Sequence, residues 1–425
     1  MSTASLPTYA PPPTDFARTP TYSAEPQAYE QRLALNLPTA RPSSDFVKQA
    51  KNVGLRLFAQ ENNASLPVYG CGADVEGAIT LAKTEGITSV EAKIEGNLIL
   101  REVAAGGTTA HKLCLSRVTL WSKDSSTEPC PRSLKFCLTL PTTFNDEKDT
   151  YPLPPTHNVH LAGMPGFNAT IEYRVSAIVS YTKAATVLRL GNGTVSTPFV
   201  YLPRSRPAVP LPPPMRQGRN SSKFIEDDDW RLSEAVMKAR LAGGKDIHCQ
   251  FYIPATRVFS VTEAVPFHVM FQSSAFSLAA FLPYGPTASI LAPNKQFTRV
   301  RVLRQSIVDV RNELISGTKT DMWRVDTIGE GEFRHAGDGP DWLCFSGEIR
   351  LDKGVKVGGF KAGGLNIKDF IELSMIPPEP ARAPFSEMRL VIPIRLTTDP
   401  WSSDGSTAHA IIDDFSTPSP PSERA

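Results

Sequence analysis

The sequence predicts an all-β protein of two antiparallel β-sandwiches in tandem, with disordered, proline-rich tails. Apolar and polar side chains alternate along several stretches, among them residues 92–96, 171–179 and 390–396. A period of two is typical of strands that have one face in a core and one in water. Turn-forming glycines separate these stretches, and no strand–helix–strand rhythm appears, which argues against a parallel α/β fold.

The tails are predicted from the distribution of proline. The chain has 425 residues and 38 prolines, which gather in the first 42 residues, around residues 204–214 and in the last 30 residues. Segments that combine proline with serine, threonine and alanine cannot bury enough apolar surface to offset the entropy of ordering. We therefore expect a disordered arm over residues 1–50 and a disordered tail over residues 401–425.

A proline-rich stretch near the middle of the chain indicates the domain boundary. Residues 204–214 hold five prolines. Such a stretch favours extended polyproline II and cannot lie in a central strand. We expect an N-terminal sandwich over residues 51–203, a proline-rich linker over residues 204–225 and a C-terminal sandwich over residues 226–400.

One short helix is expected at the start of the second domain, over residues 230–242. Asp229 is suited to cap its N-terminus, and the glycine pair that begins at Gly243 is suited to end it. The apolar residues that would share one helical face are Leu232, Val236 and Ala239. Strand patterns return after this segment.

Six short segments stand out, namely PVYGCGADVEG at 67–77, VEAKIEGNLIL at 90–100, LPP at 153–155, IEYRVSA at 171–177, FVYLPRSRP at 199–207 and IHCQFYIP at 247–254. In their order and spacing these segments resemble those of arrestin-like proteins, in particular the fungal arrestin-related (alpha-arrestin) type. The resemblance covers about residues 50–400 and implies the arrestin fold, in which two immunoglobulin-like sandwiches lie side by side and serve as a cargo adaptor. The buried charge network by which visual arrestins sense phosphate cannot be mapped onto this sequence.

An LPxY motif lies in the N-terminal arm, with Leu6, Pro7 and Tyr9 as its defining residues. WW domains bind such motifs through the polyproline-like backbone, and the tyrosine fills a neighbouring groove. In arrestin-related proteins these motifs recruit WW-domain ubiquitin ligases of the HECT type, so the resemblance implies such a partner here. The alternative is a proline-rich tail with an incidental tyrosine.

Three residues that precede proline are candidate phosphorylation sites, namely Thr19 in the arm and Thr417 and Ser419 in the tail. A phosphate would add a charge of about −2 and would dock the tail on basic residues or block a partner. The alternative is an unmodified terminus.

A group of arginines is the candidate for contact with anions. Arg299, Arg301 and Arg304 lie close together, and the first two share one strand face. They are suited to meet anionic lipid or a phosphorylated tail, which would allow a transient contact with a membrane surface. The alternative is an ordinary solvated strand face.

Composition and motifs argue against several classes of function. The chain has 45 basic and 43 acidic residues, so its net charge of +2 gives no field that would attract nucleic acid. No nucleophile elbow, Cys–His arrangement or phosphate-binding loop is present, and the His157–His160 pair lacks a third metal ligand. We expect no enzyme activity, no cofactor, no metal and no nucleic acid partner.

The expected location is the cytoplasm, peripherally at the plasma membrane or endosomes. The N-terminus lacks the pattern of a signal peptide, and no stretch approaches the ~20 apolar residues that cross a bilayer. Together with the resemblance, the expected location predicts an adaptor. It would link cytosolic tails of membrane transporters or receptors to a WW-domain ligase, for ubiquitin-dependent endocytosis and sorting. The alternative is a retromer-type trafficking or signalling scaffold that recruits no ligase.

Overall fold

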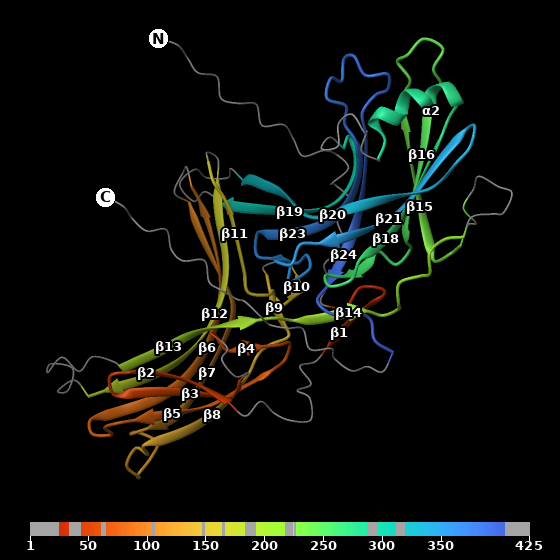
Figure 1. Cartoon of the computed structure of the whole chain (residues 1–425). Helices are drawn as coiled ribbons and strands as arrows, with labels where there is room; N and C mark the ends of the chain where they lie inside the picture. Colours follow the sequence, from red (N-terminus) through yellow and green to blue (C-terminus); the bar gives the residue numbers. More distant parts are fainter. Residues whose placement is uncertain are drawn as a thin grey trace, which may run out of the picture.

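The computed structural model shows an all-β protein of two β-sandwiches, the arrangement that the alternating patterns predict (Figure 1). In the part of the chain that the structure describes, the exceptions to strand and loop are the short helix α2 (Ala275–Phe281) and the 3₁₀ turn η2 (Leu282–Tyr284). The described residues are 25–33, 44–60, 65–103, 107–146, 149–163, 166–182, 193–216, 224, 227–286, 296–311 and 319–403.

The N-terminal sandwich packs a four-stranded sheet against a six-stranded one. All of its strand pairs are antiparallel except the short pairing of β13 with β4. The first sheet has the order β2 (Ser44–Ala50), β3 (Val53–Gln60), β5 (Asp74–Leu81) and β8 (Ser133–Thr139). The second has the order β4 (Val68–Tyr69), β13 (Gly193–Tyr201), β12 (Phe167–Tyr181), β6 (Ile87–Glu102) and β7 (Thr108–Ser122), with β11 (His157–Leu161) also on β12. A separate hairpin is formed by β9 (Thr143–Asn145) and β10 (Thr150–Pro152).

The core of this sandwich follows the predicted alternation. Every second side chain of β12 from Ile171 to Val179 is at most 1% exposed. Tyr173 in this row donates a hydrogen bond from its phenol to the carbonyl of Pro154 at 2.6 Å. Opposite it, a Cβ on Gly96 would lie 2.4 Å from the Tyr173 ring, so glycine is required there for the two strands to approach.

The C-terminal half is one ten-stranded sheet that curls until its first strand, β15, contacts β24 near the other end. The apolar core lies inside this curl. The strand order is β15 (Trp230–Met237), β16 (Ile247–Pro254), β18 (Val265–Gln272), β21 (Trp342–Leu351), β20 (Lys319–Asp338), β19 (Thr298–Arg311), β23 (Leu365–Met375), β24 (Met388–Thr397) and β17 (Val258–Ser260), with β22 (Lys361–Ala362) on β23. The pairing of β17 with β24 is parallel.

The helix predicted over residues 230–242 is wrong, because most of that segment is strand β15. Trp230 and Leu232 point to one side of the sheet, and Ala235 and Met237 point to the other. The period is therefore two, and pairing with β16 supplies the backbone hydrogen bonds that a helix would have made internally. Helix α2 was not predicted, and Ser274 caps its N-terminus by accepting the amide hydrogen of Ser277.

The prediction that residues 1–50 form a disordered arm is wrong for two segments. Residues 44–50 form β2, and β1 (Glu30–Leu33) pairs antiparallel with β14 (Arg204–Pro207) in the predicted linker. β1 is stabilised by a strand far away in the chain and β2 by a hairpin with the next strand, β3, and a local count of apolar residues registers neither pairing. Residues 1–24, 34–43 and 404–425 lie outside the described residues.

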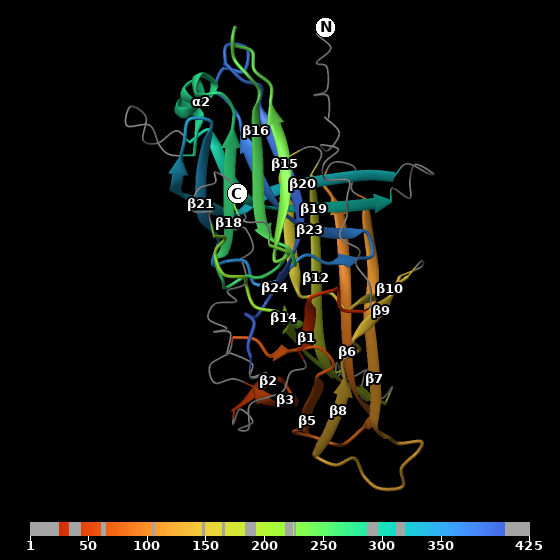
Figure 2. The same ribbon diagram turned by 90° about the vertical axis from the view of Figure 1, so that its right-hand side faces the viewer.

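The two halves share part of one core. Side chains from β19, β20, β22, β23 and the segment before β22 belong to the same apolar cluster as the N-terminal sandwich. Figures 1 and 2 show β19, β20 and β23 crossing the ends of β6, β7 and β12. The residues that the C-terminal half contributes are Val308, Met322, Phe360, Ala362, Leu365 and Ile367. Among the described residues, no helix is long and apolar enough to span a bilayer.

Candidate functional site

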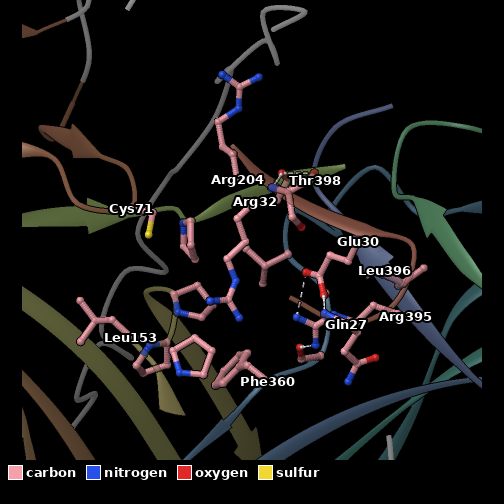
Figure 3. A pocket seen from close by; sticks show the side chains of 18 of the residues that line it. Gln27, Glu30, Arg32, Cys71, Leu153, Arg204, Phe360, Arg395, Leu396 and Thr398 are labelled. Carbon is pink, nitrogen blue, oxygen red and sulfur yellow. Dashed lines mark hydrogen bonds and ion pairs between the residues drawn. The ribbon is translucent and has the colours of Figure 1, made fainter. Parts of the chain in front are cut away.

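A charged pocket lies where the N-terminal segment, the interdomain connection and the C-terminal sandwich meet (Figure 3). It has a volume of about 80 Å³. Its walls come from β1, from β14, from the turn at residues 152–155, from residues 357–361 and from the end of β24. These segments are far apart in the sequence, so the pocket exists only in the folded two-domain protein.

The first ion pair of the pocket joins β1 to β24. Glu30, whose side chain is 2% exposed, accepts a hydrogen bond from Arg395 at 3.2 Å. The second terminal nitrogen of Arg395 donates to the carbonyl of Gly359 at 2.6 Å. Figure 3 shows Glu30 and Arg395 pointing toward each other with Gln27 beside them. The pair therefore fixes the N-terminal segment and the 357–361 segment to the same strand.

The second ion pair joins the interdomain connection to the end of the C-terminal sandwich. Arg204 binds both carboxylate oxygens of Asp399, with Nε at 3.0 Å from Oδ2. Asp399 is 3% exposed. The Asp399 amide donates to the carbonyl of Ser205, and the Ser205 amide donates to Thr398 Oγ1, each at 2.9 Å. A bidentate pair of this kind holds the connection in one orientation.

Arg304 takes part in a third ion pair and is buried. Its Nε and Nη2 atoms donate to the two oxygens of Asp369 at 2.8 and 3.1 Å, and Nη2 also donates to the carbonyl of Val357 at 2.7 Å. Next to it, the His157 ring packs edge-on against Phe360. Burial, and then the charge of Arg304, lower the pKa of His157 to about 4. Arg304 therefore organises the interior and does not face an external anion.

The other two predicted arginines differ in their environments. Arg301 donates to Glu372 at 2.6 Å, and Arg389 binds the other oxygen of the same carboxylate at 3.1 Å. Glu372 is 1% exposed. Arg299 is exposed. Of the three arginines singled out in the sequence, Arg299 is thus the one that presents its side chain to solvent.

The charged side chains that line the pocket are mostly basic. Four basic side chains line it against two carboxylates, and two of the four are held in the ion pairs described above, Arg204 with Asp399 and Arg395 with Glu30. Burial raises the pKa of the Tyr201 phenol, which therefore stays protonated. Among the described residues, no group of three or more His, Cys, Asp or Glu side chains could hold a metal ion. The charged lining residues are Arg32, Arg204, Lys361, Arg395, Glu25 and Glu30.

The remaining predicted site residues cannot be placed. Leu6, Pro7 and Tyr9 of the LPxY motif, and the candidate phosphorylation sites Thr19, Thr417 and Ser419, lie outside the described residues. Sequence reasoning missed Glu30, Arg395 and Asp399. The available signal was weak, because Arg395 occupies an apparently solvent-facing position of an alternating strand and its partner lies at the other end of the chain.

Comparison with known proteins adds no assignment. No protein-family model matches the chain, and no curated protein matches it.

Proposed function

We propose that the protein is a non-enzymatic, arrestin-like adaptor. It links cytosolic tails of membrane transporters or receptors to a WW-domain ubiquitin ligase of the HECT type, and cargo is thereby marked for endocytosis and sorting. The support is that the two sandwiches offer surfaces for contact, while the charged pocket between them is built from binding groups.

The observation that carries the proposal is the attachment of the N-terminal arm at the domain junction. Tyr9 lies 16 positions before Glu25, the first described residue. A chain of that length spans at most about 55 Å. A ligase bound to the LPxY motif would thus stay close to cargo on either sandwich, and this proximity raises the effective concentration of one for the other.

A patch at the far end of the C-terminal sandwich supports a peripheral location at membranes. Phe276 on α2 and Leu282 on η2 are 55% and 54% exposed, and Ile376 in the loop after β23 is 40% exposed. Arg299 and Lys245 are exposed at the same end. Protruding apolar side chains flanked by cations fit the interface of an anionic bilayer.

Binding to purified WW domains tests the proposal. The full chain should retain a tandem WW protein in a pull-down, and Tyr9→Ala should abolish this retention because the tyrosine groove is left empty. Tyr22→Ala is the matched control, since Tyr22 lies in the weaker TPTY sequence of the same arm. Equal retention of the wild-type and Tyr9→Ala chains would contradict recruitment of a ligase through the LPxY motif and would favour the retromer-type scaffold.

A further inference from the structure

The outer face of the C-terminal sheet carries an aromatic cluster where antiparallel sheets usually face water. The cluster lies on β15, β16, β18 and β21, and its aromatic members are at most 7% exposed. The ring of Phe224 contacts the ring of Tyr252 edge-on and the ring of His268 at a tilt, with ring centroids 5.4 and 5.1 Å apart. Its buried members are Phe224, Trp230, Tyr252, Met270 and Cys344.

The proline-rich segment that follows β14, residues 208–216 and here called the connector, covers this cluster and is fixed to it by two hydrogen bonds. The indole nitrogen of Trp230 donates to the carbonyl of Pro213 at 3.3 Å. The amide of Met215 donates to Nε2 of His268 at 3.2 Å, and Nδ1 of His268 lies 2.7 Å from the hydroxyl of Ser346. Donation by an aromatic side chain to a carbonyl of a proline-rich strand is the mode by which binding modules hold polyproline II.

Every third residue of the connector from Pro210 to Arg216 is exposed. Proline at 210 and 212–214 fixes φ and restricts the preceding residues, which favours polyproline II with three residues per turn. Pro212 and Met215, on the edge that faces the sheet, are half-buried. Pro210, Pro213 and Arg216 share another edge, and all three are exposed.

We propose that this exposed edge is a docking ligand for a protein module that recognises polyproline II in an aromatic-lined groove with an acidic rim, as SH3 domains do. Pro210 and Pro213 have the PxxP spacing, and Arg216 on the same edge suits the acidic rim. Docking on the sheet has already ordered the segment, so little conformational entropy is left to lose on binding. This second docking site is independent of the LPxY motif.

Calorimetric titration of the full chain with a panel of purified SH3 domains tests the inference. At least one domain should bind, and Pro210→Ala/Pro213→Ala should weaken that binding by about tenfold or more. Tyr9→Ala should leave it unchanged, which separates this site from the proposed ligase motif. The thermal unfolding midpoint and the fluorescence of Trp230 report whether the double variant keeps the docked connector.

Two results would overturn the inference. One is that no SH3 domain of the panel binds the wild-type chain. The other is that the double variant, with its fold and Trp230 fluorescence intact, binds the same domain as tightly as the wild type does. Loss of SH3 binding in Tyr9→Ala would also overturn it, because the arm and not the connector would then be the ligand.

Discussion

Glu30 and Arg395 are 365 positions apart in the chain, and their side chains meet at 3.2 Å in the domain junction. Glu30 is also the first residue of β1, whose backbone pairs with β14. Strand β1, which precedes the first sandwich in the sequence, is thus held by strand β24 of the second sandwich. The N-terminal arm therefore starts from a fixed point on the folded protein.

Removing the carboxylate of this pair should release β1. Glu30→Ala leaves Arg395, 18% exposed, without its counter-charge, so we expect the free energy of unfolding to fall by about 3 kcal/mol. Hydrogen exchange should become faster at residues 30–33 and 204–207. Gln31→Ala is the control, because Gln31 accepts a hydrogen bond from Arg206 at the exposed surface and should cost under about 1 kcal/mol. Unchanged exchange in the Glu30 variant would contradict the role of the pair.

Stability should fall as the pH is lowered from about 6.5 to about 4. Burial, and for His157 also the Arg304 charge, lower the pKa of His157 and His268 to about 4. The unfolded chain, in which histidine titrates near 6.5, then binds more protons than the folded chain in this range. Stability is fully present above pH 6.5 and is lost toward pH 4.

The histidine contribution can be isolated by substitution. His157→Gln/His268→Gln should show a shallower decline of the unfolding midpoint between pH 6.5 and 4 than the wild type. His335→Gln is the control, because this ring is half-exposed and pairs with Asp338 at the surface. An identical pH profile in the double variant and the wild type would show that other groups cause the decline.

Gly96→Ala should destabilise the N-terminal sandwich. The added Cβ would lie 2.4 Å from the Tyr173 ring and 3.0 Å from the sulfur of Cys114, so strands or rings must shift. We expect a loss of about 1–3 kcal/mol in denaturant unfolding. Gly354→Ala is the matched control, since nothing lies within 4 Å of a Cβ there. Equal stability of the two variants would argue against the close approach.

Polar substitution of the exposed patch should weaken membrane binding. Phe276→Ser/Leu282→Ser removes the two most exposed apolar side chains of that end, and we expect about tenfold less co-sedimentation with vesicles that contain phosphatidylserine. Leu115→Ser is the control, because Leu115 is 50% exposed on β7 of the other sandwich. Equal losses in both variants would point to non-specific adsorption.

The strands with clear alternation could be predicted because their pattern is local. In β12 every second residue is apolar, and one face enters the core whatever the partner strand is. In β15 the pattern is ambiguous, since Leu232, Val236 and Ala239 fit a helical face, while each face of the strand packs against an apolar cluster over only part of its length. The connector covers the outer face of β15 near Trp230. The sequence of β15 alone gives no sign of this contact.

The charged pocket could not be predicted from the sequence. Arg204, Arg304 and Arg395 each occupy positions that are compatible with solvent, and each is paired with a carboxylate far away in the chain. An arginine in a strand has the same appearance in a sequence whether it faces water or a buried acid. The pairing depends on how the two sandwiches are joined, which only the structure reveals.

The apolar cluster that both halves share should make the two sandwiches unfold as one cooperative unit. Phe360, Leu365 and Ile367 complete a core that belongs mostly to the other sandwich. If the chain were cut at the connector, these apolar side chains would be exposed to solvent, so separately produced halves should be prone to aggregate. Heating the intact chain should therefore give one melting event.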